Sequence, residues 1–285
     1  MGKIVIVGSG PAGCSAALYA ARAGQEVVVI SMGMGALSKA ELIQNYYGFE
    51  EGITGAELYR QGVAGAKAVG AEFITAEVVG LDYTGSLVVQ TTEGDYPADA
   101  VILATGAGRI APKIAGLAEH EGRGVSYCAT CDAFFYRGKT AAVLGSGEYA
   151  LHEVQALLPL AGRVILCTNG EPLTADFPEG EICTEKLAAV EGEEKVSALR
   201  LENGELLPVE GLFVALGVAG SAALARKLGA PVENGRIVVD EKMQTGIPGL
   251  YAAGDCTGGL LQVCKAVYEG ALAATEAIKQ IRGKK

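Results

Sequence analysis

The stretch KIVIVGSGPAG, residues 3–13, decides the fold of the first part of this chain. Its β-branched run Lys3–Val7 predicts a strand, and the Ala-rich stretch after it predicts a helix. Glu26–Ile30 predicts a second strand, so the three elements make a βαβ unit. The turn between strand and helix carries the G-x-G-x-x-G pattern of dinucleotide-binding domains, with glycines at 8, 10 and 13.

The glycines of this turn and the two residues that begin the helix each have a physical role. Gly8 makes the tight turn, Gly10 lets the backbone approach a pyrophosphate, and Gly13 lets helix and strand pack closely. Pro11 and Ala12 begin the helix, whose N-terminal N–H groups and partial positive charge suit phosphate. The turn therefore predicts a cofactor that contains a pyrophosphate.

The end of the second strand favours FAD over NAD as that cofactor. An NAD site carries an acid there for the ribose, whereas this chain has Ser31, whose hydroxyl is the available substitute. FAD can also be bound by several other loops of the domain. Two such loops are the turn at Gly106 and the turn that contains Gly254 and Asp255.

A weaker copy of the unit begins at Thr140. Residues 145–150 read GSGEYA, so Gly145 and Gly147 match the fingerprint and Ala150 replaces its third glycine. Glu148 faces the region that a pyrophosphate occupies, and the next strand ends in Cys-Thr-Asn, without the cation that NADP needs or the acid that NAD needs. A working nicotinamide site and a remnant of the fold both remain open.

Two such units predict an α/β fold with two Rossmann-like dinucleotide-binding domains, the second inserted in the first. The chain is expected to cross between them near 108–112 and 235–240, where Gly and Pro cluster. The FAD-binding domain then comprises 1–110 and 239–285, and the inserted nicotinamide-type domain comprises 111–238. Further strands are expected at Glu72–Asp82, Ser86–Thr92 and Ala100–Ala104.

The strongest chemical signal is the motif CATC, from Cys128 to Cys131. A C-x-x-C spacing allows a small disulfide ring and lowers the pKa of one thiol. The resulting thiolate is a ready nucleophile. Zinc is disfavoured because no second ligand pair stands at a standard spacing, so no metal is expected. Asp132 follows directly and suits a general acid for a departing thiolate, and an N-cap role is compatible with that position.

The other five cysteines carry less information. Cys14, Cys167 and Cys183 are expected to be small buried residues. Cys256 and Cys264 flank the expected flavin loop, and burial is favoured over an additional redox pair there.

Composition excludes several classes of function. Over 285 residues, 33 Asp and Glu outnumber 23 Lys and Arg, and the resulting formal charge of −10 repels nucleic acid. The glycines of the first turn interrupt the N-terminal apolar run, so neither a signal peptide nor a membrane span is expected. Seven cysteines without a secretory pattern indicate a reducing, cytoplasmic compartment.

Over nearly its whole length the chain resembles the low-molecular-weight thioredoxin reductases of bacterial type. The matching segments are, in order, Gly8–Gly13, Gly35–Gly48, Ile53–Gly55, Ala104–Gly106, Cys128–Asp132, Gly145–Ala150 and Ala252–Gln262. The resemblance implies FAD in the discontinuous domain, a redox disulfide in the inserted one, a thioredoxin-like protein substrate and a homodimer. It adds to the flavin site Gly35, Ala36, Leu37, Asn45, Gln262 and Val263.

The same resemblance implies roles for the dithiol. Cys131 is the thiol nearest the flavin, Cys128 attacks the thioredoxin disulfide, and Asp132 is the acid. The chain departs from the family in three places: Cys-Thr-Asn replaces an Arg-rich run after the strand that ends at Cys167, Leu261 replaces an Arg before the last helix, and Ala36 stands where many members have Gln.

The first departure bears on the electron donor. Because Cys-Thr-Asn supplies no cation for the 2′-phosphate of NADP and no acid for NAD, reduced ferredoxin is favoured as donor over NADPH and NADH, which both remain open. Ferredoxins are acidic, as this chain is, so docking calls for a local basic patch. The candidates for that patch are Arg60, Lys67, Arg109, Lys113 and Arg123. A flavin dithiol oxidase that uses oxygen ranks below the ferredoxin-dependent and the NAD(P)H-dependent reductase. In such oxidases a His usually follows the second Cys, whereas this chain has Asp132. A flavin-binding module without turnover ranks last.

Overall fold

The computed structural model describes residues 1–107, 113–178 and 180–283. The chain divides into two compact units: unit 1 comprises Met1–Arg109 and Gly220–Lys285, and unit 2 comprises Ile110–Ala219. Unit 2 is thus inserted in unit 1. The first expected crossing, at 108–112, falls outside the described residues.

The second crossing lies at 219/220, ahead of the expected 238/239. The reason is helix α5 (Ser221–Lys227), which packs against strand β4 (Val78–Tyr83) of unit 1. The hydroxyls of Ser221 and Thr105 lie 2.6 Å apart, and the Ser221 N–H donates to the Thr105 hydroxyl oxygen at 2.9 Å. Residues 220–238 therefore belong to unit 1, and their expected place in the inserted domain is wrong.

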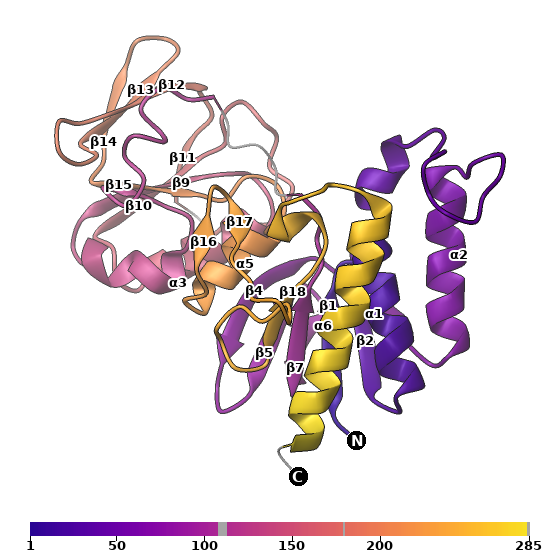
Figure 1. The fold of residues 1–285 in the computed structure, drawn as a ribbon. Coiled ribbons are helices and arrows are strands. Elements are labelled where there is room, and N and C mark those ends of the chain that lie inside the picture. The colour runs from indigo at the N-terminus through magenta and orange to yellow at the C-terminus, as the bar shows by residue number, and fades with distance from the viewer. Residues whose placement is uncertain (108–112, 179, 284–285) are drawn as a thin grey trace. The chain divides into compact units, whose positions relative to one another are not determined.

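Unit 1 is built on a five-stranded parallel sheet of order β18-β7-β1-β2-β3. The strands are short and apolar, as a sheet buried on both faces requires: β1 (Lys3–Val7), β2 (Glu26–Ile30), β3 (Glu72–Ile74), β7 (Ala100–Leu103) and β18 (Leu250–Ala252). Helices α1 (Pro11–Arg22) and α6 (Val263–Gly283) lie side by side, the latter in yellow in Figure 1. Small Ala side chains of both helices fill the core between them and the sheet.

Smaller elements complete unit 1. They are the helices η1 (Gly35–Lys39), α2 (Gly55–Ala68) and η3 (Asp255–Thr257), and the strands β5 (Leu87–Thr91), β6 (Gly94–Ala98), β16 (Val232–Glu233) and β17 (Arg236–Ile237). Strands β4, β5 and β6 form an antiparallel sheet that contacts β1 and β7.

Unit 2 repeats the plan of unit 1. Its sheet has the order β11-β10-β9-β15-β8 and is parallel throughout: β8 (Val125–Ser126), β9 (Thr140–Leu144), β10 (Arg163–Cys167), β11 (Glu181–Cys183) and β15 (Gly211–Val214). Helix α4 (Glu148–Leu157) follows β9, so the second βαβ unit is present. This confirms the α/β fold with two dinucleotide-type domains.

The rest of unit 2 consists of two short helical turns and an antiparallel sheet. The turns are α3 (Ala129–Asp132) and η2 (Ala133–Tyr136); the sheet contains β12 (Leu187–Glu191), β13 (Ala198–Leu201) and β14 (Leu206–Pro208). Across the described part of the chain, no helix has both the length and the apolar character that crossing a membrane takes.

Candidate functional site

The loops that follow four parallel strands of unit 1 meet at one edge of its sheet. Because β1, β2, β7 and β18 run in the same direction, the residues after their last positions lie at the carboxyl edge. This edge brings together four of the residues assigned to the cofactor: Gly8, Ser31, Gly106 and Gly254. Doubly wound sheets bind nucleotides at this edge.

The turn between β1 and α1 contains two kinds of glycine. A Cβ on Gly13 would lie 1.9 Å from the Gly8 carbonyl oxygen, and a Cβ on Gly8 would lie 2.4 Å from the Ala104 carbonyl oxygen, so the fold itself requires both glycines. A Cβ on Gly10 would meet no heavy atom within 4 Å among the described residues outside its own chain neighbours, and its backbone is extended, with φ −69° and ψ −172°. The space beside Gly10 adjoins the N-terminus of α1, which fits a pyrophosphate.

Three hydroxyl groups cluster at the end of β2, where the sequence lacks the ribose-binding acid. Ser9 Oγ lies 2.7 Å from Ser31 Oγ and 3.0 Å from the Tyr59 hydroxyl oxygen. Ser31 Oγ also accepts a hydrogen bond from the Gly33 N–H at 2.9 Å. Tyr59 comes from α2, and no pattern in the sequence indicated that it reaches the turn. Such hydroxyls can donate to and accept from a ribose.

An ion pair between the buried Glu269 and the partly exposed Lys265, not expected from the sequence, holds the loop after β18. Glu269 Oε2 accepts hydrogen bonds from the Gly254 N–H at 2.8 Å and the Thr257 hydroxyl at 2.9 Å, and lies 3.0 Å from Lys265 Nζ. Lys265 Nζ donates to the Gly254 carbonyl oxygen at 2.8 Å. The i,i+4 spacing of Lys265 and Glu269 on α6 was the signal that could have found the pair. The pair fixes the backbone just before Asp255.

The other residues expected around the flavin lie near η1 and at the start of α6, all in unit 1. Asn45 Nδ2 donates to Gln262 Oε1 at 2.8 Å, which joins two segments far apart in the sequence. In η1, Gly35 and Ala36 are exposed and Leu37 is buried. Val263 begins α6.

The second glycine turn, between β9 and α4, has the framework of the first. A Cβ on Gly145 would lie 2.2 Å from the Ala215 carbonyl oxygen, so the fold requires this glycine as it requires its counterpart in unit 1. Glu148 stands in the first turn of α4, and Ala150 is buried. The turn is therefore a structural copy of the dinucleotide fingerprint.

The middle glycine of that second turn is not open. A Cβ on Gly147 would lie 3.1 Å from Thr174 Oγ1, so a side chain stands close to the space that is empty at Gly10. The Thr174 N–H donates to the Ser146 carbonyl oxygen at 2.8 Å, which fixes this residue beside the turn. No pattern in the sequence indicates that Thr174 reaches this turn.

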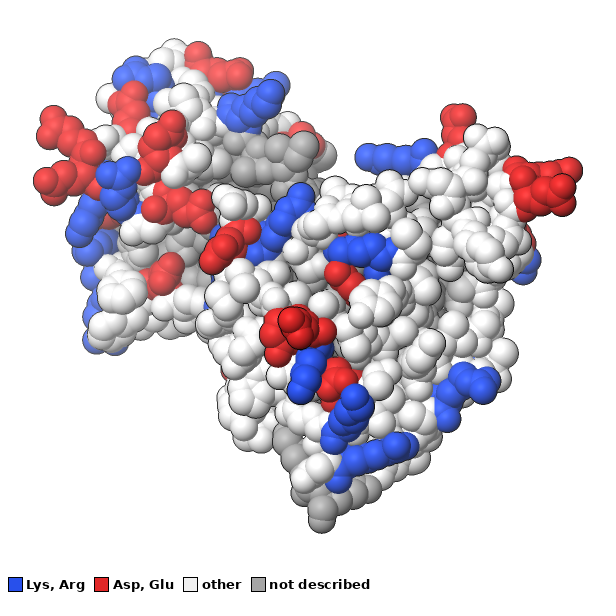
Figure 2. All heavy atoms as spheres, viewed as in Figure 1, with Lys and Arg blue, Asp and Glu red and all other residues white. Residues whose placement is uncertain are grey.

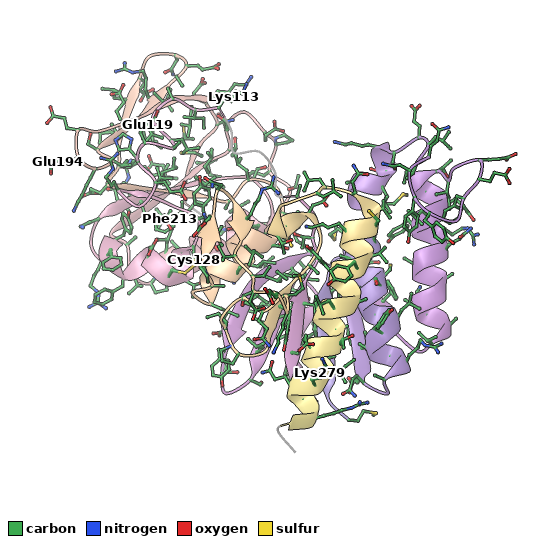
Figure 3. The ribbon with its side chains drawn as sticks, in the orientation of Figure 1. Lys113, Glu119, Cys128, Glu194, Phe213 and Lys279 are labelled. Atoms are coloured by element: carbon green, nitrogen blue, oxygen red, sulfur yellow. A yellow bond between two sulfur atoms is a disulfide. The ribbon has the colours of Figure 1, made fainter. Side chains whose placement is uncertain are left out.

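Cys128 and Cys131 form a disulfide in unit 2, with their Cα atoms 5.3 Å apart; Cys128 is labelled in Figure 3. The motif follows β8, and the Cys131 N–H donates to Cys128 Sγ at 3.1 Å across the first turn of α3. Cys128 is 3% exposed, whereas Cys131 is exposed. The cysteine pair expected from the motif is thus present.

Ser126, which the sequence analysis missed, connects the disulfide to Asp132. Its buried hydroxyl donates to Asp132 Oδ2 at 2.7 Å and accepts a hydrogen bond from the Cys128 N–H at 3.1 Å. Asp132 therefore has a fixed position at the end of the motif. Burial, and then the charge of Asp132, raises the pKa of the Tyr136 phenol.

Helix α4 supports the same motif from its other side. The Tyr149 hydroxyl donates to the Tyr127 carbonyl oxygen at 3.0 Å, and the carboxylate of Glu153 accepts a hydrogen bond from the Ala129 N–H. Glu153 is 1% exposed, so it is a buried carboxylate at the start of the cysteine turn. The helix that follows the second glycine turn thus positions the dithiol.

Two aromatic side chains follow the motif at the surface. Phe134 and Phe135 are 65% and 67% exposed and lie edge to face with their centroids 6.3 Å apart. Tyr136 instead points inward and packs edge-on against Phe213, with 5.1 Å between the ring centroids. The cysteine turn is therefore anchored through Tyr136 and presents an apolar pair to solvent.

Comparisons with known proteins cover almost the whole chain. The family model described as pyridine nucleotide-disulphide oxidoreductase matches residues 2–270. A thioredoxin reductase of Aquifex aeolicus is 35% identical over an alignment 306 positions long, which covers 99% of this chain and 94% of that protein.

Two solved structures resemble this one closely. An atypical thioredoxin reductase from Desulfovibrio vulgaris Hildenborough is 40% identical, with a TM-score of 0.93 and 99% of both chains covered. A ferredoxin-flavin thioredoxin reductase from Clostridium acetobutylicum is 35% identical, with a TM-score of 0.74 over 99% of this chain and 98% of that one. The chain belongs to the pyridine nucleotide-disulphide oxidoreductase family, and within it is a thioredoxin reductase-like flavoprotein disulfide oxidoreductase.

Proposed function

We propose that this chain holds FAD at the carboxyl edge of the unit 1 sheet and passes electrons through Cys128 and Cys131 to a thioredoxin-type disulfide. The observation that carries the proposal is the Cys128–Cys131 disulfide on a turn whose acid, Asp132, is held by a buried serine. The open space at Gly10, beside a helix N-terminus, supports FAD as the resident group. FAD supplies the redox chemistry that reduces a disulfide.

The reduced dithiol acts by thiol–disulfide exchange. Following the roles that the resemblance implies, Cys128 attacks the substrate disulfide, forms a mixed disulfide and releases one substrate thiolate, which Asp132 protonates. Cys131 then attacks Cys128 Sγ, which restores the intramolecular disulfide and releases the second substrate thiol.

The surface next to the motif supports a protein substrate. Large apolar side chains that stay exposed mark contact sites for other proteins, and aromatic residues contribute strongly there. Phe134 and Phe135 directly follow the redox-active turn and are more than half exposed. A thioredoxin-like protein brings the apolar surface needed to cover them.

As electron donor we propose reduced ferredoxin. The side chain of Thr174 beside Gly147 and the negative charge of Glu148 in the first turn of α4 both oppose a pyrophosphate at the second turn. The residues after β10, Thr168 and Asn169, supply no cation for a 2′-phosphate. The likeness to a ferredoxin-flavin thioredoxin reductase supports the same donor class.

The basic patch expected for such a donor stays a prediction. On the face seen in Figure 2, basic and acidic side chains are interspersed. Arg60, one of the five candidates, is paired with Glu57 at 2.6 Å, and Arg109 lies outside the described residues.

Anaerobic bleaching of the flavin tests the donor. Reduced ferredoxin should bleach the yellow protein within the mixing time, whereas micromolar NADPH or NADH should leave its visible spectrum unchanged over minutes. Dithionite serves as the control that the flavin is reducible. Rapid bleaching by NADPH, or failure of ferredoxin where dithionite succeeds, contradicts the donor assignment and leaves the dithiol chemistry intact.

NADPH is the second candidate donor because one contact favours it. A Cβ on Gly170, just after β10, would lie 3.2 Å from Lys186 Cε, so Lys186 brings a cation near the position at which NADP needs one. If NADPH bleaches the wild type, Lys186→Ala should weaken that reaction about tenfold, as expected for loss of one phosphate contact of ~1.4 kcal/mol. Ferredoxin-driven bleaching should not change.

Ser126→Ala should slow thioredoxin reduction about tenfold. The substitution removes the hydroxyl that links Asp132 to the Cys128 backbone, and leaving a buried hydrogen-bonding group without its partner costs ~1–3 kcal/mol. Steady-state turnover with thioredoxin measures the effect, while flavin content should stay at the wild-type level. Ser197→Ala is the matched control, since that serine is exposed in the same unit. Equal rates for Ser126→Ala and the control would contradict the positioning role.

A further inference from the structure

Two of the other cysteines stand opposite each other at the carboxyl edge of the unit 2 sheet. Cys167 is the last residue of β10, Cys183 is the last residue of β11, and the parallel register pairs their Cα atoms directly. Neighbouring strands lie about 4.8 Å apart and paired side chains project from the same face. A disulfide joins Cα atoms that are about 4.4–6.8 Å apart, and the usual spacing of neighbouring strands lies within that range.

The two thiols already interact. Burial, and then the neighbouring Cys183, to which it is hydrogen-bonded, raises the pKa of the Cys167 thiol. Cys167 is fully buried, whereas Cys183 is partly exposed on β11, which is the edge strand of the sheet. A small oxidant in solution therefore reaches Cys183 first, and Cys167 lies beside it on the neighbouring strand.

A metal site explains this pair less well than redox chemistry does. Within residues 1–107, 113–178 and 180–283, no group of three or more His, Cys, Asp or Glu side chains could hold a metal ion. From the sequence both cysteines are expected to be small buried residues, which is confirmed for Cys167, whereas Cys183 is partly exposed. The dithiol chemistry proposed above uses neither.

We propose that Cys167 and Cys183 form a second redox pair, separate from Cys128 and Cys131, that closes to a disulfide on exposure to a peroxide. The Cys183 thiolate attacks one peroxide oxygen, breaks the O–O bond and becomes a sulfenic acid, with hydroxide as the leaving group. Cys167 then attacks the Cys183 sulfur, the S–O bond breaks and water leaves. In sum two thiols and one hydrogen peroxide give one disulfide and two waters.

The disulfide acts as a covalent clamp on the second glycine turn. The chain between the two cysteines contains Thr174, the residue that lies against Gly147. Closing the bridge makes the pairing of β11 with β10 covalent, so the strand ends on either side of Thr174 can no longer separate. Oxidation therefore holds this segment over the turn, whichever donor serves the flavin.

Peptide mapping of the wild-type holoprotein tests the pair. Arg163 and Lys186 bound one tryptic peptide that contains both cysteines, and Glu179 and Glu181 offer cleavage sites between them. After hydrogen peroxide treatment, the tryptic peptide should lose the mass of two hydrogen atoms, and digestion after Glu should yield two peptides joined through Cys167 and Cys183. Dithiothreitol should restore both thiols.

Thiol counts supply the controls. In denaturant the chain offers five free thiols beside the Cys128–Cys131 disulfide, so alkylation after peroxide should fall from five to three. Cys183→Ser should show no such loss of two, whereas the matched variant Cys264→Ser, which removes an exposed cysteine, should lose two as the wild type does. Persistence of five thiols, a sulfinic acid on Cys183 with Cys167 still free, or a bridge from Cys167 to another cysteine would overturn the proposal.

Discussion

Replacing Cys128 by serine should reduce thioredoxin reduction by a factor of about 10³ or more, because the exchange reaction loses its nucleophile. The disulfide can no longer form, yet the cradle at the carboxyl edge of the unit 1 sheet keeps every contact described above. The variant should therefore purify yellow, with flavin still reducible by dithionite. Cys131→Ser should show the same loss of turnover, since it removes the second sulfur of the relay. Turnover with thioredoxin and visible spectra measure the two quantities separately.

A trapping experiment then tests which cysteine meets the substrate. Cys131→Ser, which keeps Cys128, should form a stable mixed disulfide with a thioredoxin that lacks its resolving cysteine, visible on a non-reducing gel. Cys264→Ser is the control for nonspecific thiol coupling at an exposed position. If only Cys128→Ser traps thioredoxin, through the exposed Cys131, the two roles are exchanged. Full activity in either single variant would contradict the dithiol mechanism as a whole.

Gly10→Val should weaken FAD binding on the order of 100-fold, about 3 kcal/mol, without unfolding the protein. The extended backbone at Gly10 suits a β-branched residue, and a Cβ there meets no atom of the described residues within 4 Å beyond its chain neighbours. A ligand in that space would therefore meet the valine side chain. Flavin titration of the apoprotein should show the weaker binding. The melting curve of the apoprotein should indicate a change in stability of no more than ~1 kcal/mol.

Gly13→Ala is the matched comparison, because its effect should be the reverse. A Cβ at Gly13 would stand 1.9 Å from the Gly8 carbonyl oxygen, so strand and helix must separate, at a cost of about 3 kcal/mol to the free energy of unfolding even without flavin. Unchanged flavin affinity in Gly10→Val would place the pyrophosphate elsewhere. A wild-type melting curve for Gly13→Ala would contradict the packing described here.

The limits of sequence patterns are visible in the strands around residues 72–98. The sequence predicted one strand over Glu72–Asp82, but the structure has two, β3 in the parallel sheet and β4 in the antiparallel one. Strand β6 was missed altogether, since GDYPA has low strand propensity and forms only through pairing with β5. Both errors arise because propensity does not indicate which partner a segment finds.

The candidate site shows the same division residue by residue. Gly8, Gly10, Gly13 and the cysteine motif were found from spacing alone, because their chemistry depends on neighbours within a few positions of the chain. Two contacts could not be predicted in this way: Tyr59 with the Ser9 hydroxyl, and Ser126 with Asp132. Neither residue belongs to a sequence pattern, because packing between distant segments places its side chain.

By itself, then, the sequence determined the two glycine turns, the dithiol and the α/β architecture, all of which follow from short-range backbone geometry and from the alternation of strands and helices. Tertiary structure alone decided which glycine has open space and which does not: Gly10 and Gly147 are equivalent in the motif, and only the second has Thr174 beside it. It also decided the boundary at 219/220 and the pairing of Cys167 with Cys183. The physical reason is that sheet register and side-chain packing join residues distant in the chain, and such contacts leave no fixed spacing in the sequence.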